Sequence, residues 1–88
     1  MTTTTNPLST EATAMFLRLA RESRSWDGIP LVDCTNPADK GYLTAMKKHG
    51  LIETTQDEEN RRCYWIMATD KGYELAAQLG ESWKQIPA

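Results

Sequence analysis

Apolar residues recur at helical spacing near the start of the chain, from Pro7 or Ser9 to about Arg24. At 100° per residue they form one stripe, and such a stripe normally faces a core. The stripe consists of Ala12, Met15, Phe16, Leu19 and Ser23, and Trp26 closes its end. Residues 1–6 are polar and rich in threonine, so we expect a disordered tail before this helix.

A second helix is predicted between Asn36 and Gly50. Asn36 can cap the free amides, Pro37 suits the first helical position, and Gly50 can end the helix in a left-handed conformation. Leu43 and Met46 fall on one face, which should be buried. The opposite face carries amines and a hydroxyl but no carboxylate, and its residues are Lys40, Gly41, Thr44, Lys47 and Lys48.

A short β-like segment, residues 29–32, comes before this second helix, and Pro30 restricts it to the edge of a sheet. Only three residues separate the segment from Asn36. Two arrangements therefore stay open for the connection. Either a preceding helix is reduced to one turn, with Gly41 dividing it from the next helix, or a loop replaces it.

A β-hairpin should follow Gly50. Residues 51–56 and 61–68 are rich in β-branched and aromatic side chains, and the polar turn 57–60 lies between them. On the second strand, one face would carry Cys63, Trp65 and Met67, and the other Arg62, Tyr64 and Ile66. Thr69 then caps a third helix that ends near Leu79, with Gly80 as its stop.

Together these elements predict a small α+β domain over residues 7–80. Its expected architecture is a winged helix-turn-helix, with three helices and a two- or three-stranded antiparallel wing sheet. The C-terminal tail, residues 81–88, contains Trp83 and Ile86, two large apolar side chains that need cover. The tail should either pack on the domain or join Leu17 in a homodimer contact.

The composition is that of one small domain, because 40% of the 88 residues are hydrophobic and 25% are charged. A formal charge of −2 argues against indiscriminate nucleic-acid binding but leaves room for a local basic surface. No apolar run reaches membrane-spanning length, and the N-terminus lacks a secretion signal. We therefore expect a cytoplasmic protein with reduced thiols and no membrane partner.

Groups suited to catalysis or metal binding are sparse in the sequence. Cys34 and Cys63 form no C-x-x-C pair, and neither lies at ligand spacing from the single histidine, His49. No Ser/His/Asp, Cys/His or paired-carboxylate pattern is present, and the acidic run 57–59 is typical of a solvated turn. We expect no enzyme activity, no metal site and no cofactor.

The run from Leu43 to Gly72 resembles the recognition helix and wing of winged-helix regulators of the MarR type. The counterparts in this sequence are Met46, Gly50-Leu51-Ile52, Asn60-Arg61-Arg62 and Ala68-Thr69-Asp70-Lys71-Gly72. Asn60 stands where those regulators usually have Asp, and Ala68 where they usually have Leu. The resemblance covers about a third of the chain and implies a DNA-binding regulator.

The main functional hypothesis is a sequence-specific DNA-binding protein, a transcriptional regulator or repressor of phage or mobile-element type. Lys40 and Thr44 would read base edges, and Lys47 and Lys48 would contact phosphates. At the wing, Arg61 or Arg62 would reach the minor groove or the adjacent backbone. A homodimer would bind a pseudo-palindromic site in double-stranded DNA.

The alternative hypothesis is a winged-helix module that binds a protein partner, as an adaptor or as an inhibitor of a host complex, and does not bind DNA. The acidic turn 57–59 motivates it, because carboxylates repel a phosphate backbone unless they point away.

Overall fold

Each of the three helices begins at a side chain that caps its free amides. The computed structural model describes residues 6–85 and contains α1 (Thr10–Glu22), α2 (Pro37–Lys48) and α3 (Asp70–Gln78). The Ser9 hydroxyl accepts from the Ala12 amide at 3.2 Å, and the Asn36 side-chain carbonyl accepts from the Ala38 amide at 3.0 Å. The predicted caps at Asn36 and Thr69 are confirmed, and α1 begins after Ser9 rather than at Pro7.

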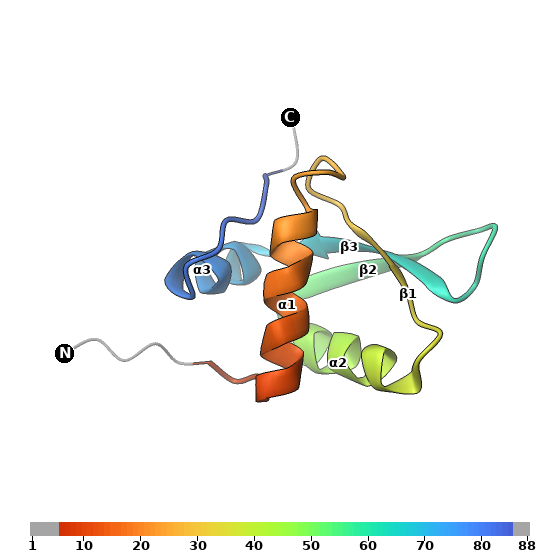
Figure 1. Ribbon diagram of the computed structural model, residues 1–88, viewed down its shortest axis with the longest axis horizontal. Coiled ribbons are helices and arrows are strands. Elements are labelled where there is room, and N and C mark those ends of the chain that lie inside the picture. The colour runs from red at the N-terminus through yellow and green to blue at the C-terminus, as the bar shows by residue number, and fades with distance from the viewer. Residues whose placement is uncertain (1–5, 86–88) are drawn as a thin grey trace.

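The strands form one antiparallel sheet in the order β1-β3-β2, where β1 is Leu31–Asp33, β2 is Ile52–Gln56 and β3 is Cys63–Ala68. Pro30 lies just before β1, which is an edge strand as expected. The predicted α+β class, with three helices and a three-stranded antiparallel sheet, is confirmed. Figure 1 shows α1 between α3 and α2, with the β2–β3 hairpin extending away from α3 as the wing.

The core lies where α1, α2 and one face of the sheet meet. Its fully buried side chains include Phe16, Leu19, Met46 and Ile66. Val32, Ile52 and Ile66 come from the three strands and share the buried sheet face. Leu17, the residue of α1 expected in a possible homodimer contact, is half-buried and packs against this core.

No helix lies between β1 and α2, so the loop is the correct one of the two predicted connections. The Cys34 amide still donates to the Arg62 carbonyl at 2.8 Å, which keeps the chain beside β3. Only Thr35 then separates Cys34 from the Asn36 cap. Gly41 does not divide α2, which runs without interruption to Lys48.

Left-handed glycines end the second and third helices, as predicted. Gly50 has φ +71° and Gly80 has φ +87°. After α2, the Leu51 amide donates to the Met46 carbonyl and the Gly50 amide to the Lys47 carbonyl, both at 3.0 Å. These two bonds form a Schellman motif, and its accompanying apolar pair, Leu51 and Met46, belongs to the core.

The wing turn is longer than the sequence pattern predicts. Strand β3 begins at Cys63, not at Arg61, because the Asn60 side chain accepts from the Arg62 amide at 3.1 Å. The Cys63 amide in turn donates to the Asn60 carbonyl at 3.0 Å. Arg61 and Arg62 therefore belong to the turn.

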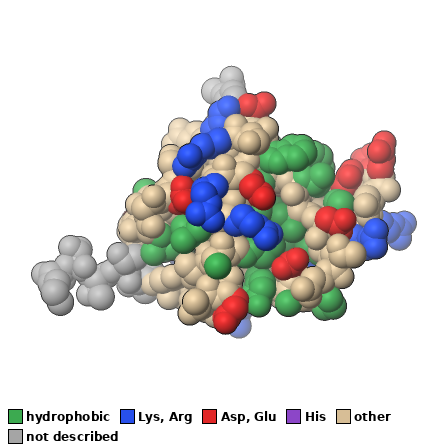
Figure 2. Space-filling model, viewed as in Figure 1, with side chains coloured by type: hydrophobic (Ala, Val, Ile, Leu, Met, Phe, Trp, Pro, Cys, Tyr) green, Lys and Arg blue, Asp and Glu red, His purple; other side chains and the backbone are tan. Residues whose placement is uncertain are grey.

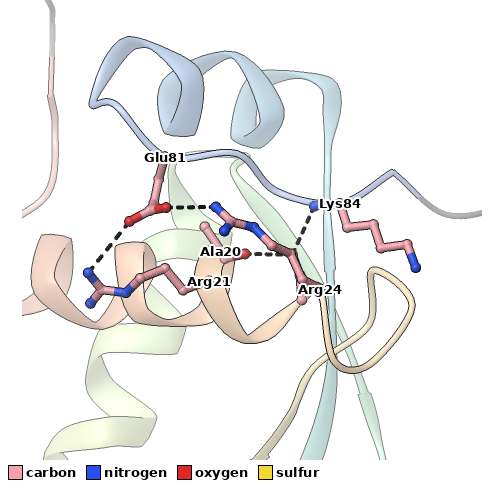
Figure 3. A network of polar contacts seen from close by, with 6 residues as sticks. Ala20, Arg21, Arg24, Glu81 and Lys84 are labelled. Carbon is pink, nitrogen blue, oxygen red and sulfur yellow. Dashed lines mark hydrogen bonds and ion pairs between the residues drawn. The ribbon is translucent and has the colours of Figure 1, made fainter.

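The C-terminal segment folds back onto the end of α1. The Trp83 ring is 4% exposed and lies 5.6 Å from the Phe16 ring, and its indole N–H donates to the Gly28 carbonyl at 3.0 Å. Figure 3 shows the Glu81 carboxylate reaching both Arg21, at 3.5 Å, and Arg24, at 3.0 Å. Trp83 thus packs on its own domain and is not exposed for a contact with a second copy of the chain.

Ser23 connects α1 to this segment from inside the structure. Its buried hydroxyl donates to the Ala20 carbonyl at 2.6 Å and accepts from the Lys84 amide at 2.8 Å. Ile86 and most of the predicted disordered tail, residues 1–5, lie outside the described residues. Among residues 6–85, the helices are all too short or too polar to cross a bilayer.

Candidate nucleic-acid interface

The outward face of α2 carries all five residues that the sequence pattern assigns to it. Leu43 and Met46 are 3% and 0% exposed, because α2 packs its apolar stripe against α1 and β2. The exposed residues of the opposite face are Lys40, Gly41, Thr44, Lys47 and Lys48. The one carboxylate on the helix, Asp39, lies in its first turn, where its negative charge interacts favourably with the positive end of the helix dipole.

The lysines of α2 make no ion pair within residues 6–85. The described ion pairs are those of Arg21 and Arg24 with Glu81, and of Lys84 with Asp27 at 2.9 Å. All three lie at the C-terminal end of α1 and in the segment that covers it. The positive charge of α2 is therefore available to an external anion.

Two features of this face bear on how it could meet DNA. The Thr44 hydroxyl donates to the Lys40 carbonyl at 2.9 Å, so its proton is already engaged while its lone pairs are free to accept. A Cβ built on Gly41 would meet no atom within 4 Å, so no neighbouring group within the domain requires glycine at this position.

A hollow of about 110 Å³ lies between α2 and the base of the wing. We call it the α2–wing hollow, and its lining consists of Lys40, Leu43, Thr44, Lys47, Thr54 and Tyr64. Thr54 and Tyr64 come from β2 and β3, where Gln56 pairs with Tyr64 and Thr54 with Ile66. These two hydroxyls were not predicted from the sequence, although alternation along β3 does place Tyr64 on the face of Ile66.

The wing tip carries both signs of charge. Arg61 and Arg62 are exposed there, and so are Glu58 and Glu59. Figure 2 shows acidic and basic side chains together at this end of the molecule. Neither arginine lines the α2–wing hollow, so the structure brings together Lys40, Thr44 and Lys47 but not the two wing arginines.

A second, larger hollow of about 450 Å³ lies beside α3. It is bordered by Pro7, His49, Leu51, Lys71, Glu74, Leu75 and Gln78. His49 is exposed and forms the C-cap of α2, where its backbone amide donates to the Ala45 carbonyl at 3.1 Å.

The thiols of Cys34 and Cys63 are both free, and their surroundings disfavour the reactive thiolate. Desolvation raises the pKa of both Cys34 and Cys63, so both stay protonated at neutral pH. Within the part of the chain that the structure describes, no three His, Cys, Asp or Glu side chains are grouped to hold a metal ion.

In comparisons with known proteins, no family model, no curated protein and no solved structure matches the chain.

Proposed function

We propose that the protein is a sequence-specific DNA-binding protein that regulates transcription in the cytoplasm, in the manner of compact phage or mobile-element repressors. One observation carries this proposal: α2 presents three exposed amines that no carboxylate of the described residues neutralises. In the bound state α2 lies in the major groove, which is about 12 Å wide and admits an α-helix.

The residues of α2 divide between base edges and phosphates. Lys40 and Thr44 are four residues apart and so lie one above the other on the helix face. Thr44 can accept a hydrogen bond from an exocyclic amine of cytosine or adenine while keeping its bond to the Lys40 carbonyl. Lys47 and Lys48 supply phosphate contacts, which fix the register of the helix on the duplex.

The wing adds a second point of contact. Arg61 and Arg62, which are both exposed, reach the minor groove or the adjacent backbone. The proposal requires the carboxylates of Glu58 and Glu59 to point away from the phosphates. Two copies of the chain would bind half-sites about one helical turn apart.

Titration of the protein with duplex DNA at several salt concentrations tests this proposal. Each lysine that contacts a phosphate contributes about 0.9 to the slope of log affinity against log salt. Changing Lys47 and Lys48 together to Ala should therefore lower affinity for every sequence and flatten the slope by about 1.8.

The matched control replaces Arg18 and Arg21 with Ala. This variant loses the same charge from two exposed positions on α1. It should bind nearly as the unaltered protein does. Equal losses in the two variants would mean that net charge, not the face of α2, governs binding.

The alternative is a winged-helix module that binds a protein and not DNA. Trp26, which is 45% exposed, favours this alternative. Its ring meets that of Trp65 edge-on at 5.8 Å, and aromatic surfaces of this kind are enriched at protein interfaces. A flat or absent response in the salt titration would favour this function over the first.

A further inference from the structure

The α2–wing hollow gathers polar groups from two separate parts of the chain. Lys40 and Lys47 enter it from α2, and Thr54 and Tyr64 from the two strands of the wing. Its volume of about 110 Å³ far exceeds the roughly 10–15 Å³ that one water molecule needs. The hollow is therefore large enough for a small polar group with its hydration water.

The charges and donors around the hollow suit an anion. No carboxylate lines it, and both of its charged residues are lysines without an ion-pair partner in residues 6–85. The hydroxyls of Thr54 and Tyr64 make no hydrogen bond to another group of the described chain, so both can donate outward. Leu43, which is 3% exposed, supplies an apolar wall that strengthens hydrogen bonds to a charged ligand.

We propose that the α2–wing hollow binds one phosphate of the DNA backbone, with Thr54 and Tyr64 as hydrogen-bond donors beside Lys47. Lys40, which also lines the hollow, keeps its role toward the base edges. The inference rests on the proposed function and extends it to two residues of the sheet. It would make the wing base, and not only the wing tip, part of the DNA contact. A phosphate held from both α2 and the sheet fixes the angle at which α2 enters the groove.

Removing single hydroxyls tests this proposal without changing charge. Tyr64→Phe and Thr54→Val should each weaken binding to all duplexes by about tenfold. This loss corresponds to about 1.4 kcal/mol, because each variant lacks one hydrogen bond to a charged group. The slope of log affinity against log salt should stay unchanged, because neither residue displaces a counterion. Lys47→Ala, by contrast, should flatten that slope by about 0.9.

Matched controls come from hydroxyls outside the hollow. The control variants are Thr55→Val and Tyr73→Phe. Thr55 is next to Thr54 but on the opposite face of the sheet, and Tyr73 belongs to α3. Both should bind DNA as the unaltered protein does. Thermal unfolding of all four variants checks that each one folds.

Duplexes with a single neutral methylphosphonate then locate the phosphate. On a duplex selected from a random pool, one substituted position in each half-site should weaken the unaltered protein about tenfold. The same position should weaken Tyr64→Phe clearly less than it weakens the unaltered protein, since that variant has already lost one of the contacts to this phosphate. Additive losses at every position would overturn the inference.

The remaining outcomes separate the two proposals. If the unaltered protein binds duplex DNA with a steep salt dependence but both hydroxyl variants bind equally well, the hollow is not a phosphate site and the proposed function stands. If the unaltered protein does not bind duplex DNA at any salt concentration, both proposals fail. Chemical shifts at Thr54 and Tyr64 that move with inorganic phosphate, but not with chloride of equal ionic strength, would then assign the hollow to free phosphate.

Discussion

At the scale of single residues, Gly41 and Gly72 are both helical glycines in opposite surroundings. A Cβ on Gly41 would lie in open space, whereas one on Gly72 would lie 2.1 Å from the Leu51 carbonyl oxygen. Gly41→Ala should raise the free energy of unfolding by about 0.5–1 kcal/mol, because alanine is the better helix former. Gly72→Ala should lower it by about 1–3 kcal/mol, because α3 must move away from the start of β2.

Urea unfolding of both variants measures the two changes in the free energy of unfolding. A destabilised Gly41→Ala protein would show that glycine is needed in α2 for a reason internal to the domain. A stabilised protein with reduced duplex affinity would instead show that DNA approaches the helix closely at Gly41.

Asp27 gives a prediction on pH. A hydrogen bond and charge attraction from Lys84, whose amine lies 2.9 Å away, lower the pKa of this carboxyl group. Its contribution to stability is present above the unfolded pKa of about 4 and is lost as pH falls through the lower folded pKa. Asp27→Asn should therefore be less stable than the unaltered protein at pH 7, and the difference should shrink as pH falls through the lowered pKa of the folded state.

Asparagine is a suitable replacement at this position because Asp27 has φ 53°, a conformation that asparagine also tolerates. Thermal unfolding from pH 2 to pH 7 measures the effect. A difference between the two proteins that is constant across this range would rule out an ionised contact with Lys84.

At the scale of elements, Thr69 joins three of them. Its amide donates to the Leu51 carbonyl at 3.0 Å, its hydroxyl donates to the Gly50 carbonyl, and its oxygen accepts from the Gly72 amide at 3.2 Å. The residue therefore links the end of α2, the end of β3 and the start of α3. Thr69→Ala should cost about 1–2 kcal/mol of stability, and Thr69→Ser much less, because serine keeps the hydroxyl. Chemical denaturation of the two variants gives the comparison, and equal losses would exclude the capping role.

At the scale of the whole molecule, the C-terminal segment completes the core. Trp83 is buried against Phe16 and donates to the Gly28 carbonyl, while Trp26 is 45% exposed. Trp83→Ala should lower the free energy of unfolding by about 3–5 kcal/mol, the usual loss for a buried large aromatic side chain. Trp26→Ala should cost well under half as much. Similar losses in the two variants would show that the segment does not hold its place in solution.

The parts of the fold that depend on near neighbours in the chain could be predicted from the sequence. Helix caps, such as Asn36 and Thr69, and glycine stops, such as Gly50, depend on a few adjacent residues. The two faces of α2 follow from helical period alone, so the exposed amines could be assigned in advance.

Contacts between distant residues could not be predicted in this way. The sequence pattern started the last strand at Arg61, whereas Asn60 keeps both arginines in the turn, because its side chain accepts from the Arg62 amide and its carbonyl from the Cys63 amide. It left open where Trp83 would pack, since Phe16 and Gly28 lie far from it in the chain. The hydroxyls of Thr54 and Tyr64 were missed because strand register and the packing of α2 on β2 bring them to the lysines.

The helices, the strands and the amine-bearing side of α2 follow from the residues of each segment, because backbone preferences and periodicity act over one or two turns. Three features follow instead from packing: a loop replaces a helix before α2, the C-terminal segment closes the core, and a hollow forms beside the wing. Those features depend on how the elements pack, and packing is set by the shapes of all the surfaces that meet.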